Sequence, residues 1–167
     1  YESMVKEGLE SGTRHDTLFL GIYLGMTSQD FYTHCWELNK QGLIRQGEGN
    51  SSVLYEMKDE FKAEVDMNFY PNFYNDSIYE MPVKFRYKGW SPWAKQYSGD
   101  TLQLELLELY KELYGDGFIE INHSERGKAF VKVDGNRRIS IYRDRSADGT
   151  VWALYRDMSR QEEVNQS

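Results

Sequence analysis

The stretch FKAEVDMNFYPNFYNDSIYEMPVKFRY, residues 61–87, alternates apolar and polar side chains on both sides of a central turn. In residues 61–69 and again in residues 79–87, every second residue is apolar and those between are mostly polar. This alternation is typical of antiparallel strands that bury one face and leave the other in water. Pro82 falls among the polar positions and has no N–H to donate, so we expect residues 79–87 to form an edge strand.

A helix is predicted before these strands, over residues 28–41. Thr27 is suited to cap its start, and Asp30 stands three residues later, as in a capping box. Gly42 supplies the left-handed residue that ends many helices. The apolar stripe of this helix consists of Phe31, Cys35 and Leu38. Helical spacing also predicts a shorter helix that stops at Gly25 and carries Leu18, Phe19, Ile22 and Tyr23.

The second half of the chain repeats this order of elements. Asp100 is the expected cap of a helix over residues 100–114, and Gly115 ends it. Its apolar stripe consists of Leu102, Leu106, Leu109, Tyr110 and Leu113. Strands are expected at 118–121, 129–133, 138–143 and 150–157, with turns at Asp134-Gly135 and Asp148-Gly149.

Helices that precede runs of strands indicate the α+β class. We therefore expect two similar units, each a helix or helix pair packed on an antiparallel β-meander. The first unit spans residues 17–88 and the second spans residues 100–158, and an aromatic linker, residues 89–99, joins them. Residues 1–16 are expected to form a flexible arm and residues 159–167 a flexible tail.

Composition limits the classes of function. The formal net charge of −7 argues against a nucleic-acid partner, because neutralising phosphates supplies most of that affinity. No apolar run approaches the roughly 20 residues of a membrane-spanning helix. The chain begins without Met and without an apolar signal core, so we expect it to be a processed product whose targeting segment has been removed.

The residues with catalytic or metal-binding chemistry do not form a recognisable motif. His34 and Cys35 are adjacent on a helix and so point about 100° apart, which excludes a nucleophile–base pair between them. Cys35 lies on the apolar stripe, where a thiol behaves as a small hydrophobe. His15 and His123 add no metal-ligand spacing. We therefore expect no enzyme activity, no catalytic residue, no cofactor and no metal.

Part of the sequence resembles another class of protein. Residues 24–57 are similar to the helix–turn–helix and wing of winged-helix regulators, through Leu38, Gly42, Leu43, Ile44 and Tyr55. That resemblance implies a DNA-binding regulator, although a reading helix that carries Asp30 and Glu37 would repel the phosphate backbone. A small enzyme with an open-cone α+β fold is a second alternative, which would need a pocket that gathers distant Tyr, Asp and His residues.

A second resemblance covers more of the chain. Gly25, Met26 and Thr27 at the helix start, followed by a helix and an antiparallel meander, resemble the domain of BamE/SmpA-type outer-membrane lipoproteins. Two such units in tandem resemble the architecture of the beta-lactamase inhibitor protein. The resemblance implies a non-enzymatic, extracytoplasmic module that binds a protein or assists envelope assembly. It also implies a location in the periplasm or at the outer membrane, with a lipid anchor upstream of this chain.

Aromatic side chains are the candidate contacts with a protein partner. Aromatics make up 15% of the residues, and Tyr and Trp are favoured at interfaces because they bury a large rigid area while keeping a polar tip. The candidates are Tyr70, Phe73 and Tyr74 in the central turn and Trp90, Trp93 and Tyr97 in the linker. The alternative is that these side chains cover the seam between the two halves.

Overall fold

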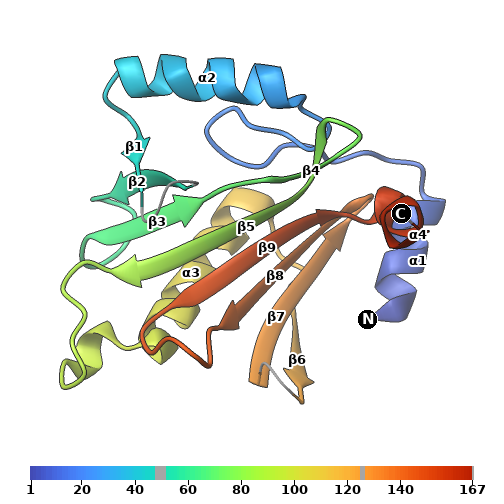
Figure 1. Cartoon of the computed structure of the whole chain (residues 1–167). Helices are drawn as coiled ribbons and strands as arrows, with labels where there is room; N and C mark the ends of the chain where they lie inside the picture. The colour runs from blue at the N-terminus through green and yellow to red at the C-terminus, as the bar shows by residue number, and fades with distance from the viewer. Residues whose placement is uncertain (48–51, 125–126, 167) are drawn as a thin grey trace.

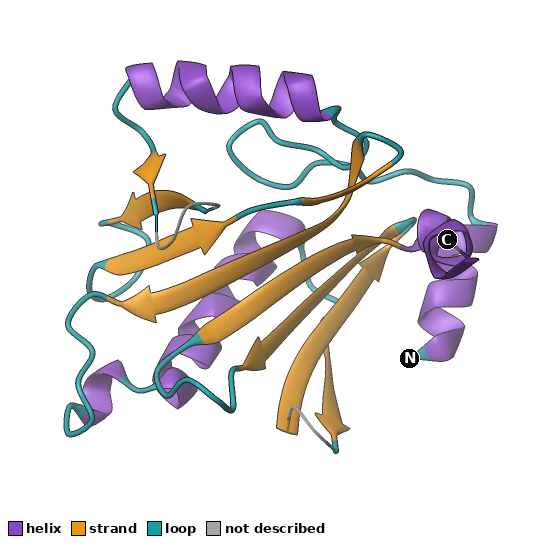
Figure 2. Cartoon of the chain, viewed as in Figure 1, coloured by secondary structure: helices purple, strands orange, loops and turns teal. Residues whose placement is uncertain are grey.

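The computed structural model describes residues 1–47, 52–124 and 127–166 (Figures 1 and 2). Its helices are α1 (Glu2–Glu10), α2 (Ser28–Lys40), α3 (Gly99–Tyr114) and α4 (Gln161–Gln166). Its strands are β1 (Arg45–Gln46), β2 (Val53–Met57), β3 (Val65–Phe69), β4 (Asn72–Tyr74), β5 (Ser77–Tyr87), β6 (Ile119–His123), β7 (Gly127–Asp134), β8 (Arg137–Arg143) and β9 (Val151–Asp157). The predicted α+β class is confirmed.

All nine strands join one antiparallel sheet, in the order β1-β2-β3-β5-β9-β8-β7-β6, with β4 paired to β5. The halves of the chain meet where β5 pairs with β9, from Glu80 opposite Arg156 to Phe85 opposite Val151. The expected division into two separate units is therefore not confirmed. Residues 89–99 connect β5 to α3 beside this continuous sheet and include a short 3-10 helix, Lys95–Tyr97.

The prediction that residues 79–87 form an edge strand is wrong, because β5 lies in the interior of the sheet between β3 and β9. The register explains how Pro82 is accommodated. Pro82 lies between Val83, which pairs with Phe69 of β3, and Glu80, which pairs with Asn72 of β4. The backbone pairing on this side of β5 is interrupted at that point. A missing N–H costs little at such an interruption.

One face of the sheet is covered by α3, which lies behind the sheet in Figure 1. The buried side chains of this face alternate along the central strands, as the sequence predicts, and each Val, Leu, Phe or Met among them contributes about 1.5–3 kcal/mol by its burial. They include Met81, Val83, Phe85, Val151, Ala153 and Tyr155, against which α3 packs Leu102, Leu106, Leu107 and Tyr110. Leu113, predicted in the helix stripe, is 61% exposed instead.

The two ends of α2 form as predicted. The Thr27 hydroxyl accepts a hydrogen bond from the Asp30 backbone N–H at 3.2 Å. At the other end Gly42 has φ of +76°, and the Leu43 N–H donates to the Leu38 carbonyl at 3.0 Å, as in a Schellman motif. The predicted cap of α3 is wrong: Ser98, rather than Asp100, accepts from the Thr101 N–H.

The predicted short helix before Gly25 does not form. Leu20 and Gly21 have φ of +53° and +81°, so the backbone turns in the left-handed region where a right-handed helix cannot continue. The isolated bridge between Thr17 and Tyr23 closes this segment into a loop. The loop still buries Leu18 and Ile22, the apolar residues on which the helical interpretation was based.

Residues 1–16, which we expected to form a flexible arm, contain the helix α1 and contact the sheet. α1 approaches the β7–β8 turn so closely that a Cβ added at Gly8 would collide with the Gly135 carbonyl oxygen. The Arg14 guanidinium forms an ion pair with buried Asp157 at 2.9 Å. The predicted tail likewise contains α4, and residue 167 lies outside the described residues. The two chain ends lie side by side at one end of the sheet (Figure 1).

Candidate functional site

The sheet has a second face, opposite α3, that we call the open face. Among the described residues no helix crosses its middle, and α1 touches only its corner, near Val133 of β7 (Figure 1). The strand register assigns to this face the positions that alternate with the buried core. They include Glu80, Pro82, Lys84, Arg86, Val131, Arg138, Ser140, Tyr142, Trp152, Leu154 and Arg156.

Aromatic and apolar side chains occupy the middle of the open face. Trp152 of β9 lies opposite Lys84 of β5 on one side and Tyr142 of β8 on the other. Two positions along β9, Leu154 lies opposite Pro82. Trp152, Tyr142 and Leu154 are each only half-buried. The centre of this face is therefore an apolar strip that remains accessible in the isolated chain.

The orientation of Trp152 is fixed from outside the sheet. Its indole Nε1–H donates to Asp144 Oδ2 at 2.8 Å. This hydrogen bond is the largest of the effects that lower the pKa of Asp144, since it favours the charged carboxylate. The hydrogen bond between Trp152 and Asp144 thus orients the indole ring on the open face.

Two arginines face each other beside this strip. Arg138 of β8 and Arg156 of β9 are directly opposite in the register. Arg156 is paired with Glu80 at 2.5 Å, whereas Arg138 donates through Nη1 to the Tyr1 hydroxyl at 2.8 Å. Among the described residues the buried Arg138 Nε has no hydrogen-bond partner. Like charges directly opposite on neighbouring strands repel, and the Glu80 carboxylate offsets this repulsion at Arg156 but not at Arg138.

The open face carries a larger share of basic side chains than the chain as a whole. Its acidic side chains include Glu56, Glu64, Asp66, Glu80 and Asp144, and its basic ones include Arg45, Lys84, Arg86, Lys88, Arg138 and Arg156. Lys88, just after β5, pairs with Glu56 at 2.5 Å and lies 3.5 Å from Asp66. Acidic and basic side chains are nearly balanced on this face, so it is less acidic than the chain as a whole, whose net charge is −7.

The predicted aromatic residues of the linker lie beside the open face or away from it. Trp90 stacks with Arg86, whose guanidinium carbon lies 4.0 Å from the ring centroid. Tyr97 packs on Tyr87, with 5.3 Å between ring centroids. Trp93 is 81% exposed. Of the three, only Trp90 extends the open face.

The predicted aromatic residues of the central turn lie at the opposite end of β5. Tyr70 and Phe73 pack on Phe31 of α2, with ring centroids 6.1 and 6.0 Å away. The Tyr70 hydroxyl lies 2.5 Å from that of Tyr32. Tyr74 instead stacks with Arg160 near the C-terminus. The six predicted residues therefore do not form one site.

Sequence reasoning missed the residues that build the open face. The signal lay in the last two strands, at the positions between the apolar core residues, which alternation predicts to be polar. These positions hold Arg138, Ser140 and Tyr142 in one strand and Trp152, Leu154 and Arg156 in the next. It is unusual to find a tryptophan, a tyrosine and a leucine at positions that are expected to face water. The pairing of these strands with β5 could not be foreseen, because nothing local marks it.

His34 and Cys35 have separate surroundings. His34 Nε2 lies 2.6 Å from the Leu20 carbonyl oxygen, and burial raises the pKa of the Cys35 thiol to about 11. A thiol that stays protonated at neutral pH is a poor nucleophile. Within the described ranges, no group of three or more His, Cys, Asp or Glu residues could hold a metal ion.

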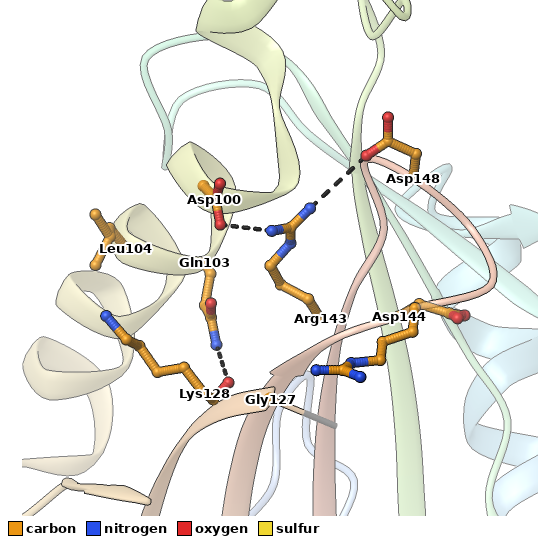
Figure 3. Close-up of a pocket in the computed structure, with 9 residues that line it drawn as sticks. Asp100, Gln103, Leu104, Gly127, Lys128, Arg143, Asp144 and Asp148 are labelled. Atoms are coloured by element: carbon orange, nitrogen blue, oxygen red, sulfur yellow. Dashed lines mark hydrogen bonds and ion pairs between the residues drawn. The ribbon is translucent and has the colours of Figure 1, made fainter. Parts of the chain in front are cut away.

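A polar cavity of about 730 Å³ lies on the helix side, where the start of α3 meets β7 and β8. Figure 3 shows Arg143 between two carboxylates, 2.6 Å from Asp100 and 3.7 Å from Asp148. Gln103 donates to the Lys128 carbonyl at 3.0 Å. These contacts attach α3 to the sheet, although the buried Arg143 Nε has no hydrogen-bond partner among the described residues, and we assign the cluster a structural role.

None of the described helices is long and apolar enough to cross a membrane. The sequence matches no protein-family model, and comparisons with curated proteins and with solved structures likewise returned no match.

Proposed function

We propose that this chain is a non-enzymatic protein-binding module whose open face receives an acidic surface of a protein partner. The observation that carries the proposal is the arginine pair, Arg138 opposite Arg156, beside the accessible Trp152. Glu80 already pairs with Arg156, whereas Arg138 donates to the uncharged Tyr1 hydroxyl, so an arriving carboxylate would pair with Arg138 and relieve the remaining repulsion.

The composition of the face supports a protein partner over a small molecule. Trp, Tyr and Arg are the residue types that contribute most binding energy at protein interfaces. Here Trp152 and Tyr142 stand on neighbouring strands of a sheet, with arginines beside them. A surface already held in shape loses little conformational entropy on binding.

The setting of this activity is proposed from the resemblance to BamE/SmpA-type lipoproteins and the beta-lactamase inhibitor protein. Supporting it are Gly25, Met26 and Thr27 before α2, and the helix followed by antiparallel strands in each half. The chain would then act outside the cytoplasm, as a binding or envelope-assembly module near the outer membrane, with a lipid anchor upstream.

Site-specific photo-cross-linking tests the binding face. We would place p-benzoylphenylalanine at Leu154 on the open face or, as a control, at Leu104, which is 55% exposed on α3. In a low-salt extract of the cells that make the protein, Leu154 should cross-link an acidic protein and Leu104 should not. Capture should fall as salt is raised, since charge attraction between exposed groups is screened over about 10 Å at 0.1 M.

Charge-reversal variants test whether the cross-link depends on this face or on general electrostatic attraction to the chain. Arg138→Glu should abolish the cross-link at Leu154, whereas Lys128→Glu, which makes the same change in net charge on the helix side, should leave it intact. Equal loss with both variants would overturn the proposal. So would retention of duplex DNA by the open face, which would favour a nucleic-acid partner instead.

A further inference from the structure

A cavity of about 400 Å³ lies on the helix side of the sheet, between α3, the segment 17–20 and strands β2, β3 and β5. Its walls are formed mainly by apolar side chains: Leu18, Phe19, Leu20, Met57, Met67, Phe85, Leu109 and Leu113. Sites for small molecules typically measure about 300–1,000 Å³ and have such linings. Met57 and Met67 are flexible enough to adapt to the shape of a ligand.

Three tyrosines line the inner end of the cavity and leave it neutral. The Tyr155 hydroxyl donates to that of Tyr110 at 2.5 Å, and the Tyr114 hydroxyl donates to the Leu18 carbonyl at 2.5 Å. Burial raises the pKa of Tyr110 and Tyr155 well above the usual value, so both stay protonated. Because these hydroxyls bond to one another, the interior offers little to hold water and suits an apolar occupant.

The mouth of the cavity is marked by a leucine, a tyrosine and a carboxylate. Leu113 is 61% exposed there, which is unusual for a side chain in an apolar wall. Burial, followed by the charge of Glu60, raises the pKa of Tyr55. The Glu60 carboxylate would repel an anionic head group and accept a hydrogen bond from an uncharged one.

The backbone of Leu20 gives an independent indication. Its φ of +53° lies in the left-handed region, which a leucine adopts only at a cost and where Asn or Gly is favoured. The side chain is half-buried in the cavity wall. Backbone strain of this kind persists only where the surrounding structure holds it, as His34 Nε2 does here at 2.6 Å from the Leu20 carbonyl oxygen, and it is common at ligand-binding sites.

We propose that this cavity binds an uncharged amphiphile with a single acyl chain, whose chain lies among the leucines and methionines and whose polar end meets Tyr55 and Glu60. The site lies on the face of the sheet opposite the open face, so it is independent of the protein-binding proposal.

Fluorescence titration with N-phenyl-1-naphthylamine, an uncharged apolar probe, tests the site. The folded chain should give a saturable rise in fluorescence with one site per chain. Dodecan-1-ol should displace the probe at lower concentration than dodecanoate, because Glu60 opposes the carboxylate.

Two exposed leucines of α3 provide a matched pair of variants. Leu113→Asp should weaken probe binding about tenfold, the loss expected for about 1.4 kcal/mol of apolar contact. Leu104→Asp, on the same helix but outside this cavity, should bind as the unmodified chain does. Leu20→Asn suits the local backbone, so it should fold and yet bind the probe more weakly. Equal binding by Leu113→Asp and Leu104→Asp, or stronger displacement by dodecanoate, would overturn the proposal.

Discussion

At the scale of single residues, Asp157 attaches the N-terminal segment to the sheet. It is 1% exposed, accepts from Asn136 Nδ2 at 3.1 Å and pairs with Arg14 at 2.9 Å. Burial opposes its charge, but hydrogen bonds from Ser159, Asn136 and Arg14 outweigh that effect and lower its pKa. The carboxylate therefore stabilises the fold in its charged form.

The pH dependence of stability follows from the sign of this shift. Because the pKa is lowered in the folded state, the stabilisation is present above the unfolded value of about 3.9 and is lost as pH falls through the folded pKa. Asp157→Asn should lower the unfolding free energy by about 1–3 kcal/mol at neutral pH, and the unfolding free energy of this variant should fall less steeply as the pH is lowered. Urea unfolding between pH 2 and 7 checks this, with substitution of the exposed Asp116 (Asp116→Asn) as the control. The same loss of unfolding free energy at low pH in Asp157→Asn and in the unmodified chain would contradict the prediction.

At the scale of elements, sequence was informative wherever a local signal determines structure. Both ends of α2 are marked by Thr27 and Gly42, and both are as predicted, since a cap and a left-handed stop depend only on neighbouring residues. The prediction of a helix around Leu20 was wrong, because the apolar residues have helical spacing whereas the backbone conformation is not helical. Ser98 was missed because Asp100 is an equally good cap by residue type.

The C-terminal stop of α2 can be tested directly. Nothing lies within 4 Å of a Cβ built at Gly42, so the cost of Gly42→Ala is that of its left-handed backbone, φ +76°. We expect a loss of about 1–2 kcal/mol in urea unfolding. Gly42→Asn should lose less, because Asn tolerates this conformation better. An alanine variant as stable as the unmodified chain would contradict the assignment.

At the scale of the whole molecule, the sequence predicts the class and most strands, but it could not place β5 beside β9. Alternation says which side of a strand is buried and nothing about its neighbour, and Pro82 pointed to an edge. The candidate site depends on that same pairing. Trp152 faces Lys84 only because the halves share one sheet, so the open face could not be predicted.

The arginine pair of the open face, Arg138 opposite Arg156, is proposed to serve binding at the expense of stability. The most direct measurement is urea unfolding of Arg138→Thr at low and high salt. Removing the like charge opposite Arg156 should raise the unfolding free energy by about 0.2–1 kcal/mol at low salt, and the gain should fade as salt screens the repulsion. Lys128→Thr, which removes a cation 3.7 Å from Glu120, should give no such gain. A less stable Arg138→Thr chain at low salt would mean that Arg138 is there for the fold, and would contradict the account.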